Sequence, residues 1–340
     1  MIKVAINGFG RIGRTFFRQA FGHSELEFVA VNDLTDEENL AYLLRYDTVY
    51  GRYGKKVETV KKGDKRYLVV DGKNILVFSE RESERLPWKD LDIDVVVEST
   101  GFFASEEGSQ KHIKAGAKKV VITAPAKGGV QHVLIGSNPE KIRDNVIISN
   151  ASCTTNSAGP VAEILMANPG VEKALLTTVH AYTATQGLVD GPGGKDDLRR
   201  GRAAAQNIVP SHTGAAEAVA KAVPVYEGIF TGIAIRVPVV CGSLTDFTFI
   251  AKRNTSVEEI NDIFRKAAKE ERWEGILSVS EEPLVSSDII GTEYAAIVDL
   301  EFTRVVGGNL VKVLAWYDNE WGYSAMLTRV VVETGRSLGK

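Results

Sequence analysis

One of the two cysteines stands where a thiol could act as a nucleophile. Cys153 lies in the run NASCTTN (150–156), after a predicted strand and at the start of a predicted helix. A helix N-terminus stabilises a thiolate and lowers the thiol pKa, which makes the sulfur more reactive. A free cysteine is more often a small core residue, but the polar neighbours of Cys153 argue against that. We therefore predict a nucleophile at Cys153 and a core residue at Cys241, which stands among strand residues.

His180 is the histidine whose position best suits proton transfer. It follows the apolar run Ala174–Val179 at a predicted strand end, where catalytic side chains of α/β proteins gather. Beside a thiol, an imidazole can form a thiolate–imidazolium pair and later move a proton. The sequence does not show that His180 meets Cys153, and a structural role fits its position equally well. The following histidines are expected on helix surfaces or in turns: His23, His112 and His132.

Arginines and hydroxyl residues in the second half of the chain could bind oxyanions. Ser211 is predicted to start a helix whose first N–H groups could hold a phosphate, with His212 beside that turn. Arg236 interrupts an apolar strand, where a charge is costly unless it is paired with a carboxylate or a phosphate. The candidate oxyanion ligands are Thr183, Arg200, Ser211, Thr213, Gly214 and Arg236. Arg199, Arg200 and Arg202 could equally well belong to a solvated basic loop or to an intersubunit contact.

A glycine-rich turn near the N-terminus predicts a dinucleotide site. The run GFGRIG (8–13) follows a predicted strand and opens a predicted helix, which is the context that this motif requires. Gly8 permits the tight turn, Gly10 lets a pyrophosphate approach the backbone, and Gly13 lets helix and strand pack closely. Asp33 ends the second predicted strand. A carboxylate there can bind both adenine-ribose hydroxyls of NAD and would repel the 2′-phosphate of NADP.

Two patterns of predicted elements would position these groups. Up to about residue 150, short apolar strands alternate with helices, which is typical of a doubly wound parallel sheet. Its expected strands are Lys3–Asn7, Phe28–Asn32, Asp94–Thr100, Lys119–Thr123 and Val146–Asn150, and its expected helices are Arg11–Phe21 and Glu106–Ala115. The segment Tyr53–Phe78 is expected to be a hairpin insertion.

The second half predicts a mostly antiparallel sheet with helices. Its expected strands are Gly232–Val239, Leu244–Lys252, Ala295–Val306 and Leu310–Tyr317, and its expected helices are Thr154–Met166, Ser256 to about Trp273, and Gly322–Leu338. The Gly-, Asp- and Arg-rich segment Thr183–Gly201 is too long for an ordinary connection, which favours a functional loop.

Composition limits the class of protein. The 340 residues suggest two domains at roughly 150 residues each. A net charge of −3 does not favour a nucleic-acid or membrane partner, and no apolar run reaches the roughly 18–20 residues that span a bilayer. The two cysteines and the scattered histidines argue against a disulfide scaffold or a structural zinc site. We expect a protein of a reducing compartment without an export signal.

Longer motifs carry a resemblance that runs from end to end of the chain. The main ones are AINGFGRIGR (5–14), ASCTTN (151–156), TTVHAYTATQ (177–186) and WYDNEWGYS (316–324). On these motifs the chain resembles the phosphorylating, glycolytic glyceraldehyde-3-phosphate dehydrogenases. The resemblance implies a Rossmann-like dinucleotide-binding domain at 1–152, with a helix at about 318–340 packing back on it. An α+β catalytic domain with a mostly antiparallel sheet would occupy 153–317.

The resemblance also implies a role for each site residue, with Cys153 as nucleophile and His180 as acid and base. The implied site for inorganic phosphate comprises Ser152, Thr154, Thr213 and Gly214. The implied site for the substrate's C3 phosphate comprises Thr183, Arg200 and Arg236, with Arg199 as a competitor of Arg200. The implied NAD ligands are Gly8, Gly10, Arg11, Ile12, Gly13, Asp33, Arg81, Thr123 and Asn319. No metal is implied.

The implied activity is the oxidative phosphorylation of D-glyceraldehyde 3-phosphate to 1,3-bisphosphoglycerate with reduction of NAD, in glycolysis or gluconeogenesis. It would pass through a hemithioacetal and a thioester on Cys153, in a cytoplasmic homotetramer. The alternatives are an erythrose-4-phosphate dehydrogenase of the same superfamily and a non-catalytic NAD-binding regulatory protein. The chain departs from the family pattern at positions that concern the loop and the phosphate sites: Gly187, Leu188, His212 and Glu217.

Overall fold

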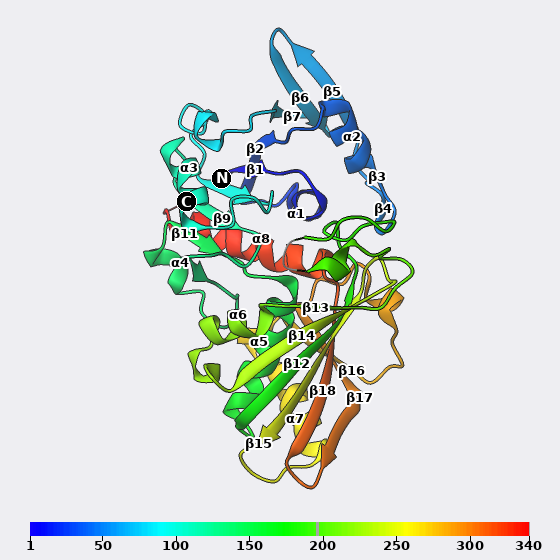
Figure 1. Ribbon diagram of the computed structural model, residues 1–340. Coiled ribbons are helices and arrows are strands. Elements are labelled where there is room, and N and C mark those ends of the chain that lie inside the picture. The colour runs from blue at the N-terminus through cyan, green and yellow to red at the C-terminus, as the bar shows by residue number, and fades with distance from the viewer. Residues whose placement is uncertain (195–196, 340) are drawn as a thin grey trace. The chain divides into compact units, whose positions relative to one another are not determined.

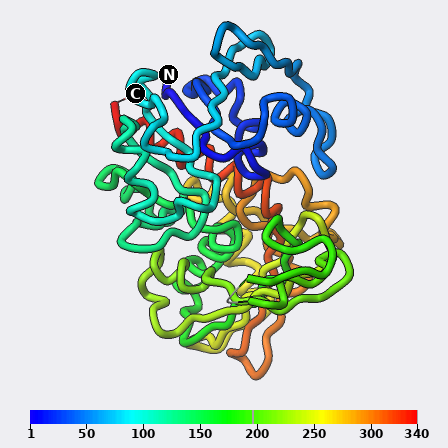
Figure 2. The backbone as a smooth tube through the Cα atoms, turned by 45° about the horizontal axis from the view of Figure 1, so that its top comes forward, coloured from blue at the N-terminus to red at the C-terminus, as the bar shows by residue number. Residues whose placement is uncertain are grey.

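The computed structural model describes residues 1–194 and 197–339, and the chain forms two compact units (Figure 1). Unit 1 comprises Met1–Ala151 and the segment that begins at Leu327, and unit 2 is Ser152–Met326. The C-terminal helix α8 (Trp321–Arg336) crosses the boundary between them. Unit 1 is therefore built from both ends of the chain, which lie close to each other in Figure 2. Lys340, the last residue of the expected helix at 318–340, lies outside the described residues.

Unit 1 is built on a mostly parallel sheet in the order β10-β11-β9-β8-β1-β2-β7-β6-β5. The strands are β1 (Ile2–Asn7), β2 (Leu26–Asn32), β5 (Val57–Lys62), β6 (Lys65–Val70), β7 (Lys73–Phe78), β8 (Val95–Glu98), β9 (Lys119–Ile122), β10 (Gln131–His132) and β11 (Ile147–Ser149). The pair β3 (Tyr46–Asp47) and β4 (Gly51–Arg52) stands apart from it. The central strands β8 and β9 are buried throughout and β1 is buried except at Lys3, as strands covered on both faces are.

Helices and apolar clusters cover both faces of this sheet. The helices are α1 (Arg11–Ala20), α2 (Glu37–Arg45), α3 (Glu106–Lys114), α4 (Lys141–Asp144) and the 3-10 turn η1 (Ser83–Arg85). Val4 joins a cluster that includes Leu327 of α8, whereas its neighbour Ala5 joins a cluster around Trp88. The end of α8 lies so close to β1 that a Cβ atom on Gly335 would stand 2.4 Å from Ile2. The doubly wound fold predicted from the sequence is confirmed.

Two details of unit 1 differ from the prediction. The segment Tyr53–Phe78 is not a separate hairpin, because β7 pairs in parallel with β2 and so extends the main sheet. Helix α2 was not expected, although Asp36 caps it by accepting a hydrogen bond from the Asn39 N–H.

Unit 2 is built on a mostly antiparallel sheet in the order β13-β14-β12-β15-β18-β17-β16. The strands are β12 (Val171–Ala181), β13 (Val209–His212), β14 (Phe230–Val237), β15 (Ser243–Ala251), β16 (Leu277–Ser280), β17 (Ala296–Val306) and β18 (Leu310–Tyr317). The helices and 3-10 turns are α5 (Cys153–Ala167), α6 (Ala215–Ala222), α7 (Val257–Ala267), η2 (Leu198–Gly201), η3 (Pro224–Tyr226), η4 (Glu271–Trp273) and η5 (Ser286–Ile289). Burial alternates along β15, as it does when helices cover one face of a sheet.

Two details of unit 2 also differ from the prediction. Ser211 does not start a helix: it lies in β13, opposite Ala234, and α6 begins only at Ala215. The helix expected from Ser256 to Trp273 ends at Ala267 and is followed by the separate turn η4. In both places the helix is shorter than predicted, because a strand or a separate turn occupies part of the expected range.

None of the helices within residues 1–194 and 197–339 is both long and apolar enough to cross a membrane. Within the same ranges, His, Cys, Asp and Glu side chains form no group of three or more that could hold a metal ion.

Candidate active site

Cys153 occupies the first position of α5, where the chain turns sharply from unit 1 into unit 2. Ala151 has a φ of 53°, in the left-handed region that non-glycine residues rarely adopt and that is often found at functional sites. Ser152 caps the helix by accepting a hydrogen bond of 3.0 Å from the Thr155 N–H, and its hydroxyl lies 2.7 Å from that of Thr155. The local sequence therefore fixes the direction of the Cys153 side chain.

The structure brings the thiol of Cys153 and the imidazole of His180 together. Sγ lies 3.3 Å from Nε2, although the two residues are 27 positions apart. His180 is the penultimate residue of β12 and is buried, and the ring of Tyr317 packs edge-on against it at 6.0 Å between centroids. The Tyr317 hydroxyl is held by Thr154 at 2.9 Å and Thr178 at 2.8 Å. Residues of three elements, α5, β12 and β18, therefore hold Cys153 and His180 in place.

Burial shifts the pKa values of both members of this pair towards their uncharged forms. Burial raises the pKa of the Cys153 thiol and outweighs the opposing effect of the positive charge on Arg236. Burial and the same charge lower the pKa of His180 to about 3. The lowered thiol pKa predicted from the helix N-terminus is therefore wrong for this arrangement of side chains, because desolvation dominates.

Arg236 lies beside His180 on the neighbouring parallel strand β14. Its Nη1 is 2.6 Å from His180 Nδ1 and 3.1 Å from the carbonyl oxygen of Ala181. Among the described residues no carboxylate pairs with Arg236, and its Nε has no hydrogen-bond partner. The buried salt bridge considered from the sequence is therefore wrong. A partly buried guanidinium without a carboxylate partner favours a bound anion as its partner.

Arg200, rather than Arg199, is the second cation at this place. Its charge contributes to lowering the pKa values of both His180 and Arg236, which requires proximity. In η2 its Nε pairs with Asp197 at 3.2 Å, and its Nη2 donates to the His212 carbonyl oxygen at 3.3 Å. Arg199 is exposed.

The other predicted phosphate ligands lie on loops and helix starts of unit 2. Thr183 follows β12, and its hydroxyl contacts that of Thr185 at 3.0 Å. Thr213 accepts a hydrogen bond from the Ala215 N–H at 3.2 Å, and Gly214 is the cap of α6, with no side chain to bond the first N–H groups. The described hydrogen bonds of these residues are local, so the structure does not tie them directly to Cys153.

Unit 1 contains a cavity of about 580 Å³ at the carboxyl ends of its strands. It is lined by Asn7, Gly8, Gly10, Asn32, Asp33, Leu34, Glu80, Arg81, Ser99, Thr100, Phe102 and Phe103. Four predicted cofactor residues, Gly8, Gly10, Asp33 and Arg81, thus share one cavity of a size usual for ligands. In an open α/β sheet this edge is where ligands bind.

The three glycines of the turn, Gly8, Gly10 and Gly13, have different structural roles. A Cβ atom on Gly13 would stand 2.3 Å from the Gly8 carbonyl oxygen, and one on Gly8, whose φ is 92°, would stand 2.7 Å from the Thr100 nitrogen. These two positions need glycine for packing inside the protein. A Cβ on Gly10 would meet nothing within 4 Å, so the space beside this residue faces the cavity. That open space is where a pyrophosphate could approach the backbone.

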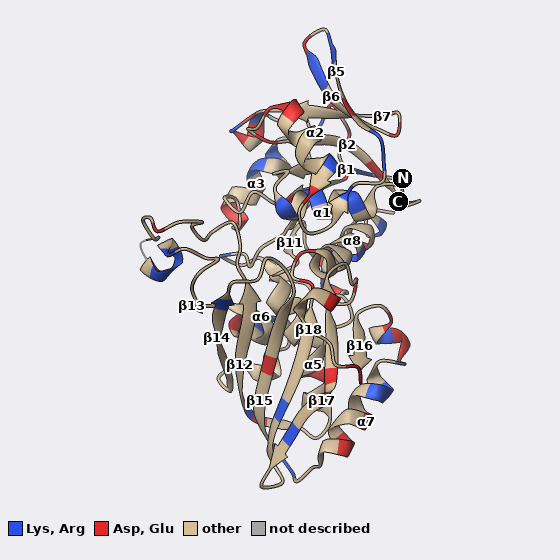
Figure 3. Ribbon diagram, turned by 90° about the vertical axis from the view of Figure 1, so that its right-hand side faces the viewer, with Lys and Arg blue, Asp and Glu red and all other residues tan. Residues whose placement is uncertain are grey.

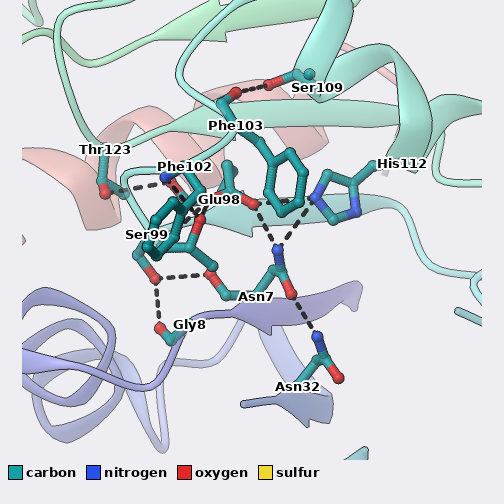
Figure 4. A network of polar contacts seen from close by, with 12 residues as sticks. Asn7, Gly8, Asn32, Glu98, Ser99, Phe102, Phe103, Ser109, His112 and Thr123 are labelled. Atoms are coloured by element: carbon teal, nitrogen blue, oxygen red, sulfur yellow. Dashed lines mark hydrogen bonds and ion pairs between the residues drawn. The ribbon is translucent and has the colours of Figure 1, made fainter. Parts of the chain in front are cut away.

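A buried polar network fixes the wall of this cavity (Figure 4). Trp88 Nε1 donates to His112 Nδ1 at 3.1 Å, so the neutral ring carries its proton on Nε2 and donates it to Glu98 at 3.0 Å. Glu98 also accepts from the Asn7 amide at 2.6 Å, and Asn7 Oδ1 accepts from Asn32 at 2.7 Å. The ends of β1, β2 and β8 are thereby joined. The expectation of a surface position for His112 is wrong, because its ring is fully buried.

The remaining predicted cofactor residues are placed as follows. Thr123 donates to the Glu98 carbonyl oxygen at 3.2 Å, next to the network. Arg11 forms an ion pair with Asp47, and Ile12 packs against the core of unit 1. Asn319 belongs to unit 2, where its Oδ1 accepts hydrogen bonds from Gly242 and Ser243.

Two features of the sites were not predicted from the sequence. Tyr317 supports the Cys153–His180 pair, and only its place at the end of an apolar strand, inside the motif WYDNEWGYS, could have drawn attention to it. Phe102 lines the cavity while 90% exposed, and an aromatic residue in a short polar loop was its only signal. Cys241, by contrast, is buried as predicted and donates to Asp318 at 3.2 Å.

Comparison with known proteins gives matches that cover nearly the whole chain. The family model for the NAD binding domain of glyceraldehyde 3-phosphate dehydrogenase matches residues 2–106, and that for the C-terminal domain matches residues 152–319. A glyceraldehyde-3-phosphate dehydrogenase of Thermotoga maritima is 50% identical over 327 residues, covering 95% of this chain and 96% of that protein. Glyceraldehyde-3-phosphate dehydrogenase 2 of Streptomyces avermitilis is 47% identical over 340 residues, covering 99% of each. The chain therefore belongs to the glyceraldehyde-3-phosphate dehydrogenase family.

Proposed function

We propose that this protein oxidises D-glyceraldehyde 3-phosphate with NAD and inorganic phosphate to give 1,3-bisphosphoglycerate. The observation that carries the proposal is the contact of 3.3 Å between Cys153 Sγ and His180 Nε2, with the arginine Arg236 beside it. A thiol adds to an aldehyde, an imidazole moves the proton, and a guanidinium binds a phosphate group. Membership of the family supports the same reaction.

The chemistry assigned to the protein's own residues has two stages. Cys153 attacks the aldehyde carbon to form a hemithioacetal, and His180 Nε2 takes the proton of its hydroxyl group. Bound NAD supplies the acceptor for the hydride that leaves this carbon. The product on Cys153 is a thioester, which inorganic phosphate attacks to release the acyl phosphate and restore the thiolate. The first backbone N–H groups of α5 can stabilise the oxyanions that form at this carbon.

Two anion sites are needed, because the substrate carries one phosphate and the attacking phosphate is another. For the C3 phosphate we assign Arg236 and Arg200, supported by their mutual proximity and by the missing partner of Arg236. Thr183 completes this set through the family resemblance. For inorganic phosphate we assign the residues at the starts of α5 and α6: Ser152, Thr154, Thr213 and Gly214.

The residues of unit 1 fit NAD. Gly10 leaves the backbone of the first turn open towards the cavity, Gly8 and Gly13 allow the close packing of that turn, and Asp33 and Arg81 stand at the same cavity. Asp33 Oδ2 accepts a hydrogen bond from Phe9 at 2.8 Å, which holds the carboxylate at the end of β2. This carboxylate supports NAD over NADP, because it would repel a 2′-phosphate. Arg11, Ile12, Thr123 and Asn319 are assigned to the cofactor by the resemblance.

We further propose that the protein works as a homotetramer in the cytoplasm. The strands of the second sheet carry few charges (Figure 3), and their exposed side chains include Leu175, Ile233, Phe302 and Leu310. An apolar sheet face of this kind is typical of an interface between subunits. A catalytic thiol at Cys153 must also stay reduced, which favours a reducing compartment.

A steady-state assay tests the proposal. NADH formation is followed with D-glyceraldehyde 3-phosphate, NAD and phosphate, each omitted in turn, and each omission should stop sustained turnover. Erythrose 4-phosphate in place of the triose should give a clearly lower kcat/KM. Binding of NAD without NADH formation under any of these conditions would contradict the proposal and point to a non-catalytic protein.

A further inference from the structure

The hydroxyl group of Ser243 joins two residues of unit 2 that belong to different parts of the sheet. Ser243 is the first residue of β15, which lies between β12 and β18 (Figure 1). Its Oγ accepts a hydrogen bond of 3.1 Å from the Ala181 N–H, at the end of β12, and donates one of 2.9 Å to Asn319 Oδ1. Ser243 and Asn319 are both buried, so water competes little for these bonds.

The contacts of the Asn319 amide determine which of its two terminal atoms is the oxygen. The Gly242 N–H donates to this amide at 3.1 Å, and a backbone N–H only donates, so the atom that it meets must be Oδ1. The single proton of the Ser243 hydroxyl goes to the same oxygen. Oδ1 therefore has two donors. Nδ2 has no hydrogen bond to the described residues and is the group that is left to bind a ligand.

The turn that carries Asn319 is held by other bonds than those of its amide. Asp318 Oδ1 accepts hydrogen bonds from the N–H groups of Glu320 at 2.9 Å and Trp321 at 2.7 Å. Its Oδ2 accepts one from the Gly291 N–H at 2.8 Å. Loss of the hydroxyl group on β15 would therefore release the side chain of Asn319 and leave the backbone of the turn in place.

The place of this amide indicates which part of NAD it would meet. In the proposed reaction the hydride passes to the nicotinamide ring from the carbon bonded to Cys153, so the ring must lie close to Cys153 and His180. Ala181 directly follows His180, and a single hydroxyl group separates it from the Asn319 amide. An amide N–H donates to oxygen acceptors, and the ring carries one in its carboxamide group. The carboxamide oxygen is therefore the acceptor that this geometry favours.

We propose that Ser243 is a positioning residue, which fixes the Asn319 amide so that Nδ2 donates to the nicotinamide carboxamide. The inference rests on the proposed function, since it takes NAD as the cofactor and Asn319 as one of its ligands. Without the hydroxyl group, the amide keeps only the Gly242 N–H and can turn about its last torsion, which has a broad energy minimum. A turned amide places Oδ1 against the carboxamide oxygen, and two acceptors repel each other.

The test compares the binding of NAD and of ADP-ribose to the full-length protein by isothermal titration calorimetry. ADP-ribose carries the groups that we assign to the cavity of unit 1 and lacks the nicotinamide ring. Ser243→Ala should raise the Kd of NAD roughly three- to tenfold, the range expected for one neutral hydrogen bond. The Kd of ADP-ribose should stay at the wild-type value. An unchanged Kd of NAD would overturn the inference, and so would equal losses for both probes, because they would indicate a general distortion.

Three further variants separate this role from a purely structural one. Ser243→Thr keeps the hydroxyl group and should bind NAD as the wild type does, whereas a loss equal to that of Ser243→Ala would count against the inference. Ser243→Cys, whose thiol is a weaker donor, replaces Ser243→Ala should the latter fail to fold, and should give a smaller rise in the Kd of NAD. The matched control is Ser157→Ala, which removes another buried hydroxyl, 3.2 Å from that of Thr245 on the same strand. It should change neither Kd.

A double-mutant cycle decides whether Ser243 acts through Asn319. Asn319→Ala removes the amide and should weaken the binding of NAD at least as much as Ser243→Ala does, again without effect on ADP-ribose. In the Asn319→Ala background, Ser243→Ala should have no further effect on the Kd of NAD, because no amide remains to be positioned. Additive losses would refute the inference. Since binding needs no turnover, the inference can fail while the dehydrogenase assay succeeds, whereas a wild-type protein that binds no NAD would contradict the proposed function itself.

Discussion

The polar groups of the two units are used in different ways. In the cavity wall of unit 1 each buried group has a compatible partner. Glu98 accepts from Asn7, His112 and the Thr100 N–H, and Trp88 donates to His112 Nδ1, while the longer contact of 3.4 Å between His112 Nε2 and the Asn7 amide nitrogen is secondary. Beside Cys153 in unit 2, Nδ1 of His180 has two incompatible neighbours. A satisfied network stiffens a wall, whereas an unsatisfied one costs free energy and is retained where protons or charges must change place. This difference supports the proposal that the first site holds a ligand and the second reacts.

The largest effect should come from removing the thiol. Cys153→Ser should lower kcat by on the order of 10⁴–10⁶-fold, the range found when a nucleophile is removed. NAD affinity, measured by the quenching of tryptophan fluorescence, should stay at the wild-type value, because the cavity belongs to unit 1. Retained turnover would remove Cys153 from the mechanism. A matched control is Cys241→Ser, which should leave kcat nearly unchanged once folding is confirmed.

Replacing the base should have a smaller effect. His180→Asn keeps a polar side chain but cannot take a proton, so the hydride-transfer step should slow by roughly 10²–10⁴-fold. A pre-steady-state burst of NADH is the appropriate measurement, since it isolates this step from the release of products. A burst of wild-type rate would show that the contact of 3.3 Å to Cys153 is structural only.

The part of each site that lies within one short segment could be predicted from the sequence. The glycine turn and the capped start of α5 depend on neighbouring residues, so motif and local structure agree. The doubly wound order of unit 1 also follows from the alternation of strands and helices.

The rest depends on the register between distant strands, which no local pattern encodes. Arg236 meets His180 because β12 and β14 pair in parallel with these residues opposite each other. Likewise, His112 lies on a helix whose exposed polar residues suggested a surface position, yet its ring is buried by Trp88 and Glu98 from elsewhere in the chain. Desolvation at Cys153 was missed for the same reason, because burial is a tertiary property.

Two glycines of unit 1, Gly10 and Gly13, allow cofactor binding and packing of the fold to be tested separately. Gly10→Ala should raise the KM for NAD roughly tenfold or more while the melting temperature changes little, because the new methyl group points into open space. Gly13→Ala should instead destabilise the fold by about 1–3 kcal/mol, because its Cβ would stand 2.3 Å from the Gly8 carbonyl oxygen. Thermal unfolding and NAD titration of both variants are the measurements. Equal losses of stability would mean that Gly10 also packs against the protein.

The smallest predicted effect comes from weakening the ion pair between Asp197 and Arg200. In the proposed site, Asp197 competes with the C3 phosphate for the Arg200 guanidinium. Asp197 pairs with Arg200 at 3.2 Å and also accepts a hydrogen bond from the Arg199 N–H. Asp197→Asn keeps that acceptor but removes the charge, so Arg200 should become more available to the C3 phosphate. Partly exposed pairs are worth about 0.2–1 kcal/mol, so the KM for glyceraldehyde 3-phosphate should fall by up to roughly fivefold at low ionic strength.

The salt dependence and a matched variant decide whether this gain is electrostatic and local. The fall in KM should vanish near 1 M salt, where the Debye length is about 3 Å. Asp190→Asn breaks the comparable pair with Arg202 at 3.0 Å and should leave the KM unchanged, because Arg202 is not assigned to the phosphate. If both variants lowered the KM equally, the loop would act through its net charge alone. Arg200 would then not be a cation held ready for the phosphate, and the comparison between the two units would rest on Arg236 alone.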